Sequence, residues 1–141
     1  MSRWFKLEEF LISKTAKKKS IDNFPSWEVV EHLSELAWFL DDIRDVWGSG
    51  IIITSGFRCE ALNKAVKGVK TSIHKIGYAA DIYPSNGKFE EFKIVVKNWI
   101  EDKNFDQCII EKNSNDDQWI HIGLYNNKGQ QRHELFNLEA A

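Results

Sequence analysis

The chain contains two stretches in which apolar residues recur every three or four positions, the spacing of a helix with one buried face. The longer stretch covers residues 26–47, where Ser26 is suited to cap the N-terminus and the glycine-rich run at 48–50 ends the pattern. Its apolar positions are Val29, Val30, Leu33, Leu36, Ala37, Leu40, Ile43 and Val46. The second stretch covers residues 88–101, with an expected buried face of Phe89, Phe92, Val95, Val96, Trp99 and Ile100. Shorter helices are expected over residues 6–13 and 59–66.

Apolar and β-branched residues also form runs of strand length. They predict strands over residues 51–54, 78–83, 106–111 and 118–125, with a further short strand over residues 132–137. Residues 84–87 and 126–129 are expected to form turns. Residues 14–23 include the lysine run 17–19 and are expected to be a solvated segment. Helices precede the first strands, and the last strands follow one another, which predicts an α+β fold with helices packed on a mainly antiparallel sheet.

Composition narrows the classes of protein that remain. The chain has 141 residues, of which 43% are hydrophobic and 13% aromatic, enough for one compact core, and a single domain over residues 1–141 is expected. A net charge of −2 gives no electrostatic argument for nucleic acid. No apolar run reaches the roughly 18 residues of a membrane span, and residues 1–6 lack the apolar core of a signal peptide. We therefore expect synthesis in the cytoplasm, where Cys59 and Cys108 stay reduced.

Two histidines and one aspartate stand out as candidate metal ligands. His74 and Asp81 lie seven positions apart, and His121 lies far downstream in a predicted strand. A zinc site that performs chemistry takes three protein ligands of nitrogen and oxygen type and leaves a fourth position for water. The other histidines, His32 and His133, have no partner motif, and we expect them to be ordinary surface or core residues.

The residues around these three resemble a known family. The matching segments, in order, are residues 5–10, 21–25, 54–59, 62–63, 68, 72–74, 77, 79–82, 105–111 and 119–122. Together they resemble the zinc D-alanyl-D-alanine carboxypeptidase family, whose small members include phage endolysins and which shares a fold with the Hedgehog signalling domain. The resemblance covers residues 5–124, and residues 126–141 would form a C-terminal tail or last strand.

The resemblance implies roles for particular side chains. His74, Asp81 and His121 would hold one zinc ion, and Ser72 would support the ligand His74. Arg58 would line the active site, where it could bind a substrate carboxylate or stabilise the oxyanion of a tetrahedral intermediate. Trp119 would form part of the substrate pocket.

Two carboxylates, Glu111 and Asp117, are candidates for the general base. Many members of the family that the chain resembles carry Glu or Asp three residues before the last ligand, but here this position is Gln118, which cannot act as a base. Glu111 ends the strand expected to pair with the one that contains His121, and its surrounding pattern resembles the small phage-type members. Asp117 shares a strand face with Trp119 and His121 if the alternation of that strand extends to it. Glu111 is the favoured candidate.

The resemblance also implies a function: a zinc peptidase that cleaves the stem peptides of bacterial peptidoglycan. It would act as a D-Ala-D-Ala carboxypeptidase or as an endolysin-type endopeptidase of phage or prophage origin. Such a protein would be a monomer that reaches the cell wall through holin-dependent release. Gln118 keeps two alternatives open: a non-catalytic zinc-binding module of the same fold, with a structural or binding role, and a peptidase for a cytoplasmic dipeptide.

Overall fold

The computed structural model describes residues 1–136 of the chain. The helices are α1 (Leu7–Leu11), α2 (Lys14–Lys18), α3 (Trp27–Trp47), α4 (Glu60–Ala65), the 3₁₀ turn η1 (Ile73–Ile76) and α5 (Phe89–Ile100). The strands are β1 (Ile51–Ser55), β2 (Ala79–Pro84), β3 (Gln107–Lys112), β4 (Gln118–Gly123) and β5 (Glu134–Phe136). Residues 137–141, and with them the last position of the strand predicted over 132–137, lie outside the described residues.

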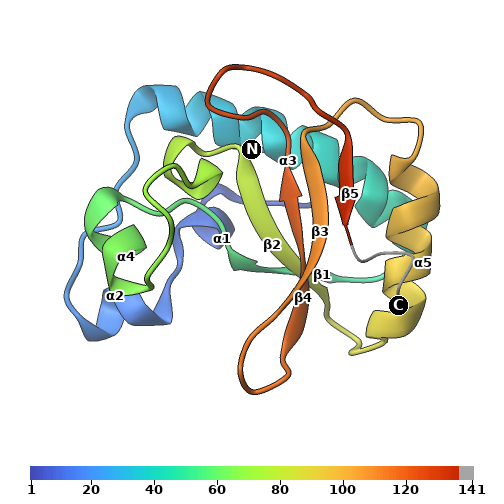
Figure 1. Cartoon of the computed structure of the whole chain (residues 1–141), viewed down its shortest axis with the longest axis horizontal. Helices are drawn as coiled ribbons and strands as arrows, with labels where there is room; N and C mark the ends of the chain where they lie inside the picture. The colour runs from blue at the N-terminus through green and yellow to red at the C-terminus, as the bar shows by residue number, and fades with distance from the viewer. Residues whose placement is uncertain (137–141) are drawn as a thin grey trace.

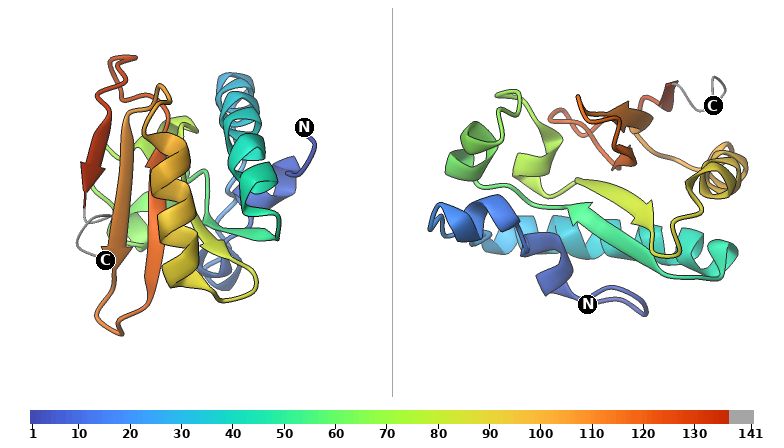
Figure 2. Two further views of the ribbon diagram at one scale, coloured as in Figure 1. Left: turned by 90° about the vertical axis from the view of Figure 1, so that its right-hand side faces the viewer. Right: turned by 90° about the horizontal axis from the view of Figure 1, so that it is seen from below.

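The strands form one five-stranded sheet in the order β1-β2-β4-β3-β5 (Figure 1). All neighbouring pairs are antiparallel except β3 and β5, which are parallel. The long helix α3 lies across one face of the sheet, and α4 and η1 lie toward the other (Figure 2). Helix α5 packs beside α3, and α1 contacts both α3 and β1. The predicted α+β fold with a mainly antiparallel sheet is confirmed.

Each central strand has one face toward the core and one away from it, because successive strand side chains point to opposite sides of the sheet. The residues that face α3 are fully buried: Ala80 and Ile82 of β2, and Ile120 and Ile122 of β4. They meet Leu36 and Leu40 of α3 in the hydrophobic core, where each large aliphatic side chain contributes roughly 1.5–3 kcal/mol. The intervening residues Asp81 and His121 therefore point away from α3. We call this second surface the site face of the sheet.

Both long helices were predicted close to their observed bounds. The hydroxyl of Ser26 accepts a hydrogen bond from Val29 N at the start of α3, and Gly48 ends the helix in the left-handed conformation, with φ of 74°. Of the apolar positions expected on its buried face, Val46 is instead 58% exposed, because it lies in the last turn, beside the open end of the helix.

Three local features differ from the sequence expectation. Residues 14–18 form α2 instead of a solvated turn, because Ser13 caps the helix and Ala16 is buried against the rest of the molecule. The turn η1 was not predicted as a helix. Strand β5 joins the sheet beside β3 in parallel, so it does not simply continue the antiparallel order of the strands before it.

Both cysteines are free thiols, as expected. Cys108 is fully buried in β3, and burial raises its pKa to about 12. Its thiol is therefore neutral in the folded protein, which excludes it as a nucleophile. Among residues 1–136, no helix combines the length and the apolar character that crossing a bilayer requires.

Candidate metal centre

Three side chains from separate parts of the chain converge on the site face. Asp81 and His121 are directly opposite each other on β2 and β4. His74 comes from η1, the short turn that precedes β2. All three are buried, with exposed fractions of 3 to 8%. The structure thus brings together the three residues that the sequence singled out as ligands.

The ligand atoms are close enough to share one ion. Asp81 Oδ1 lies 3.3 Å from His74 Nε2 and 3.1 Å from His121 Nδ1. All three ligand atoms lie within 4.8 Å of one another. Tetrahedral zinc with bonds of about 2.0–2.1 Å holds neighbouring ligand atoms about 3.3 Å apart, so the two separations from Asp81 Oδ1 fit the ion.

The His74 ring is fixed by a backbone carbonyl. Its Nδ1 lies 2.8 Å from Gly56 O, and because a carbonyl oxygen can only accept, Nδ1 carries the proton and donates. The opposite nitrogen, Nε2, is directed toward Asp81 and is the ring atom that could bind a metal ion. A metal-bound histidine typically has such a partner on its other nitrogen. Ser72 supports the same residue through the backbone, since its hydroxyl accepts from His74 N at 3.3 Å.

The charges in the cluster are matched to cation binding. Burial alone would raise the pKa of Asp81, but the facing imidazoles of His74 and His121 outweigh it and hold the pKa well below its ordinary range. Burial opposes the charged form of His121, yet the hydrogen bond and negative charge of Asp81, together with the charge of Glu111, raise the pKa of its imidazole. The cluster therefore favours positive charge beside Asp81, as a proton on His121 or as a metal ion in its place.

Arg58 borders the cluster and is held by neutral partners. Its Nη2 lies 3.8 Å from Asp81 Oδ2. Its Nε donates to the Ser55 hydroxyl at 3.3 Å, and its Nη1 donates to Asn63 Oδ1 at 3.2 Å. Only 16% of its side chain is exposed. The guanidinium is therefore oriented toward the centre without a partner that fully neutralises it.

Asn63 and Gly68 complete this support. Asn63 is buried, and its Nδ2 donates to Val69 O at 2.8 Å while its Oδ1 accepts from Arg58. A Cβ at Gly68 would collide with Asn63 Oδ1 and approach Arg58 Nη1 to 2.9 Å. A glycine is therefore needed for this loop to pass so close to the pair.

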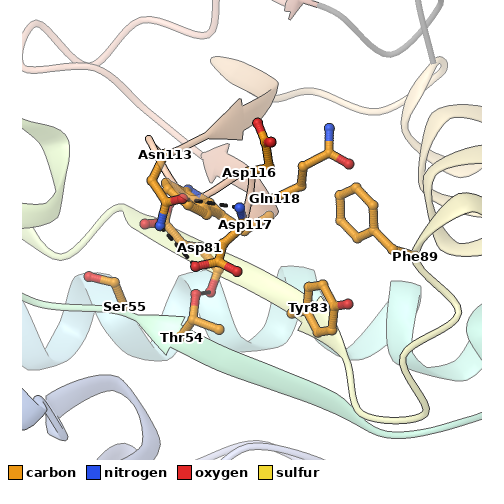
Figure 3. Close-up of a pocket in the computed structure, with 10 residues that line it drawn as sticks. Thr54, Ser55, Asp81, Tyr83, Phe89, Asn113, Asp116, Asp117 and Gln118 are labelled. Atoms are coloured by element: carbon orange, nitrogen blue, oxygen red, sulfur yellow. Dashed lines mark hydrogen bonds between the residues drawn. The ribbon is translucent and has the colours of Figure 1, made fainter.

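Two cavities border the cluster. The first, about 580 Å³, is lined by Asp81 together with Asp116, Asp117 and the aromatic residues Tyr83, Phe89 and Trp119, and we call it the acidic cavity. Figure 3 shows Tyr83 and Phe89 on one side of it and the Asn113–Asp117 pair on another. The second, about 750 Å³, contains His74, His121, Arg58 and Glu111 in its wall, together with Lys67, Lys128 and Arg132. We call it the basic cavity.

The two candidate bases lie in different cavities. Glu111 of β3 is opposite Trp119 of β4, and Trp119 Nε1 donates to Glu111 Oε1 at 2.9 Å. Glu111 shares the basic cavity with two ligands, and its negative charge acts on both His121 and Arg58. Asp117 lies before β4, in the acidic cavity, where its Oδ2 accepts from Asn113 Nδ2 at 3.1 Å. Gln118 also lines the acidic cavity.

The remaining histidines lie outside the cluster. His32 of α3 donates from Nδ1 to Ile76 O at 2.6 Å, and its ring stacks on Tyr78 with centroids 4.0 Å apart. His133 is exposed and packs against Phe105. Both positions fit the ordinary structural roles expected for them.

Sequence reasoning assigned no role to Asn23, Asn63 or Gly56. Asn23 Nδ2 donates to Leu11 O at 3.1 Å and Phe57 O at 2.9 Å, and its Oδ1 accepts from Cys59 N at 2.8 Å. It therefore links the N-terminal segment to the loop that carries Arg58. All three lie within or beside the segments that carried the family resemblance, which was the only signal in the sequence that could have marked them.

The fold and the His-Asp-His cluster are those expected of a metallopeptidase. The Peptidase M15 family matches residues 3–123, and the chain belongs to this family of zinc peptidases. The resemblance to zinc D-alanyl-D-alanine carboxypeptidases is thereby confirmed at the level of the family. No curated protein matches the sequence.

We predict that Gly56→Ala weakens both the fold and the centre. The added Cβ would lie 2.5 to 2.9 Å from the backbone of Phe10, so the loop must shift and move the carbonyl that orients His74. The expected loss is about 1–3 kcal/mol in the free energy of unfolding, and about 10–100-fold in zinc affinity. Urea denaturation and competition with a chelator measure the two effects.

The matched control is Gly123→Ala at the end of β4. There the nearest atoms to a new Cβ are 3.8 Å away, an ordinary contact, although His121 Nε2 is among them. Zinc affinity should change little. Equal losses in both variants would show that the Gly56 contact has no special part in the centre.

Proposed function

We propose that the protein is a zinc-dependent peptidase that cleaves the peptide part of bacterial peptidoglycan. The observation that carries the proposal is the placement of Arg58 and Glu111 in one cavity with the two imidazoles of the cluster. Hydrolysis of an amide requires an activated water, a group that moves its proton and a positive charge near the carbonyl oxygen. Membership of a peptidase family implies that the substrate contains a peptide bond. We propose more narrowly that this bond lies in the stem peptide of peptidoglycan.

His74, Asp81 and His121 would hold the zinc ion. A bound zinc ion supplies a Lewis acid that polarises the scissile carbonyl and lowers the pKa of water to about 7. Glu111 then takes a proton from the attacking water and returns it to the amine that leaves. The Trp119 indole orients the Glu111 carboxylate through its N–H, which leaves the second carboxylate oxygen for this transfer.

Arg58 would stabilise negative charge that develops on the carbonyl oxygen. Its position 3.8 Å from Asp81 keeps a fixed cation beside the cluster, and Ser55 and Asn63 hold its guanidinium in place. The same side chain could instead bind a terminal carboxylate of the substrate. The first role suits an endopeptidase and the second a carboxypeptidase.

The biological setting that we propose follows the small phage-type members of the family. The bond would be of the D-Ala-D-Ala or the L-Ala-D-Glu type. The protein would act as a monomer made in the cytoplasm of a host that carries a phage or prophage, and it would reach the cell wall after holin-dependent release.

The first prediction concerns zinc. The protein should bind one zinc ion per chain, and His74→Ala and His121→Ala should each lose it, while His133→Ala outside the cluster should retain it. Elemental analysis after gel filtration measures the stoichiometry. Full zinc in both ligand variants would contradict the assignment.

The same centre predicts a pH dependence. A proton and zinc compete for the ring nitrogen of His121, and its raised pKa means that the proton competes up to a higher pH than the ordinary value of about 6.5 allows. Zinc affinity should therefore fall as pH falls through this raised pKa. Asp81 should not limit binding there, because its pKa is lowered and it stays ionised.

The role of Glu111 as the general base is tested by substitution. Glu111→Gln should retain zinc but lower kcat by about 10²–10⁴-fold, the usual contribution of a general base. Asp117→Asn is the matched control, and its effect should be smaller because Asp117 lies in the acidic cavity. The opposite ranking would transfer the role to Asp117. An unchanged kcat in both variants would show that neither carboxylate is the base, whereas no turnover by the wild type would favour the non-catalytic zinc-binding module.

The function itself is tested on purified peptidoglycan. Zinc-loaded protein should release new amino and carboxyl termini within the stem peptides, identified by mass spectrometry, and His121→Ala should release none. Unchanged peptidoglycan together with cleavage of free D-Ala-D-Ala would favour a dipeptidase. The absence of both would contradict the proposal.

A further inference from the structure

The basic cavity carries more positive charge than its visible partners neutralise. Arg58, Lys67, Lys128 and Arg132 line it, with Glu111 as the opposing carboxylate among the described residues of its wall. Arg132 is already paired, because its Nε and Nη2 donate to the two oxygens of buried Asp106 at 2.7 and 2.9 Å. The two lysines differ, since neither ammonium has an ion pair within residues 1–136.

These lysines come from two loops that are joined to each other. Lys67 follows α4, and Lys128 lies in the turn before β5. The Asn127 side chain donates from Nδ2 to Thr71 O at 2.9 Å, which ties the second loop to the first. Although far apart in the sequence, the two lysines thus line one cavity from connected loops.

The backbone at Lys67 is unusual. Its φ of 61° lies in the left-handed region, at the position after a helix where glycine is the usual residue. A lysine there costs free energy that glycine would not, and such strain marks positions where a side chain can have a use other than folding. The side chain lines the cavity that contains His74 and His121.

The acidic cavity has the opposite charge. Asp81, Asp116 and Asp117 line it, and none of its described lining residues is Lys or Arg, although Lys112 Nζ lies 3.5 Å from Asp116 Oδ1 as an exposed ion pair. The metal cluster therefore separates a positive cavity from a negative one. A substrate that spans the cluster would meet opposite charge in the two cavities.

We propose that Lys67 and Lys128 form an anion-binding subsite that takes a carboxylate of the peptide substrate. The inference rests on the proposed function in one respect, that the ligand is a peptide whose anionic groups are carboxylates. The carboxylate could be the C-terminus of the peptide or the side chain of an acidic residue near the scissile bond. The lysines touch the bound carboxylate and not the reacting atoms, so they act on substrate binding.

The test uses zinc-loaded full-length protein and four matched peptides around the cleaved bond. One pair differs in a C-terminal acid or amide, and the other pair has Glu or Gln at the same internal position. Wild type should prefer the acid over the amide in whichever pair carries the recognised carboxylate. An exposed ion pair changes binding by about 2- to 5-fold, so two lysines should give a preference of about 5- to 20-fold in kcat/KM. The preference should shrink at high ionic strength.

Lys67→Gln and Lys128→Gln should each reduce the preference by about 2- to 5-fold, and the double variant should nearly abolish it. The change should appear in KM, with kcat on the amide or Gln peptide unchanged. Lys70→Gln is the control, because it removes the same charge from the same loop but does not line the cavity. Lys67→Gly separates charge from backbone strain: it should lose the preference even though glycine suits the left-handed conformation.

An unchanged preference in the double variant, or an equal loss in Lys70→Gln, would overturn the subsite. Equal cleavage of acid and amide, and of Glu and Gln peptides, by wild type would also overturn it while leaving the peptidase function intact. If wild type cleaves none of the peptides, the proposed function fails, and calorimetric titration of the same peptides still decides the subsite. Tighter binding of an acid peptide to wild type than to the double variant supports it, and equal binding overturns it.

Discussion

The centre depends on the alternation of side chains along β2 and β4. Burial of Ala80 and Ile82 on one strand and of Ile120 and Ile122 on the other fixes which face each strand turns toward α3. Asp81 and His121, which lie between these residues, are thereby placed opposite each other on the site face. A shift of either strand by one residue would bury the ligands and expose the aliphatic side chains. The core thus sets the register of the two candidate ligands, Asp81 and His121.

Segments outside the sheet contribute two further side chains to the centre. The sheet supplies Asp81, His121 and Glu111, whereas His74 and Arg58 arrive on segments without strand structure. Backbone contacts hold these segments together, because Gly56 O accepts from the His74 ring and Arg58 N donates to His74 O at 3.1 Å. Arg58 and His74 are consequently positioned relative to each other by hydrogen bonds between their own two segments.

The sequence was informative where one periodicity dominates a long segment. Helices α3 and α5 have continuous apolar faces, so their bounds could be predicted, and the motif spacing identified the three residues that converge. The parallel pairing of β5 with β3 could not be predicted, because Asp106 and Arg132, which join the two segments, lie 26 residues apart and neither has a diagnostic pattern. The short turn η1 likewise depends on contacts to Gly56, 18 residues away.

The contacts that orient His74 have a consequence for how the sequence can diverge. The groups that hold it are a carbonyl of Gly56, an amide of Arg58 and the hydroxyl of Ser72. Two of these three belong to the main chain, which every residue type supplies except that proline lacks the N–H. Substitution at most neighbouring positions therefore leaves the hydrogen bonds of the ligand available, and drift is restricted mainly where space for a side chain is missing, as at Gly56 and Gly68. A lineage with this fold can thus change most of its surface and much of its loop sequence while the geometry around the ion persists.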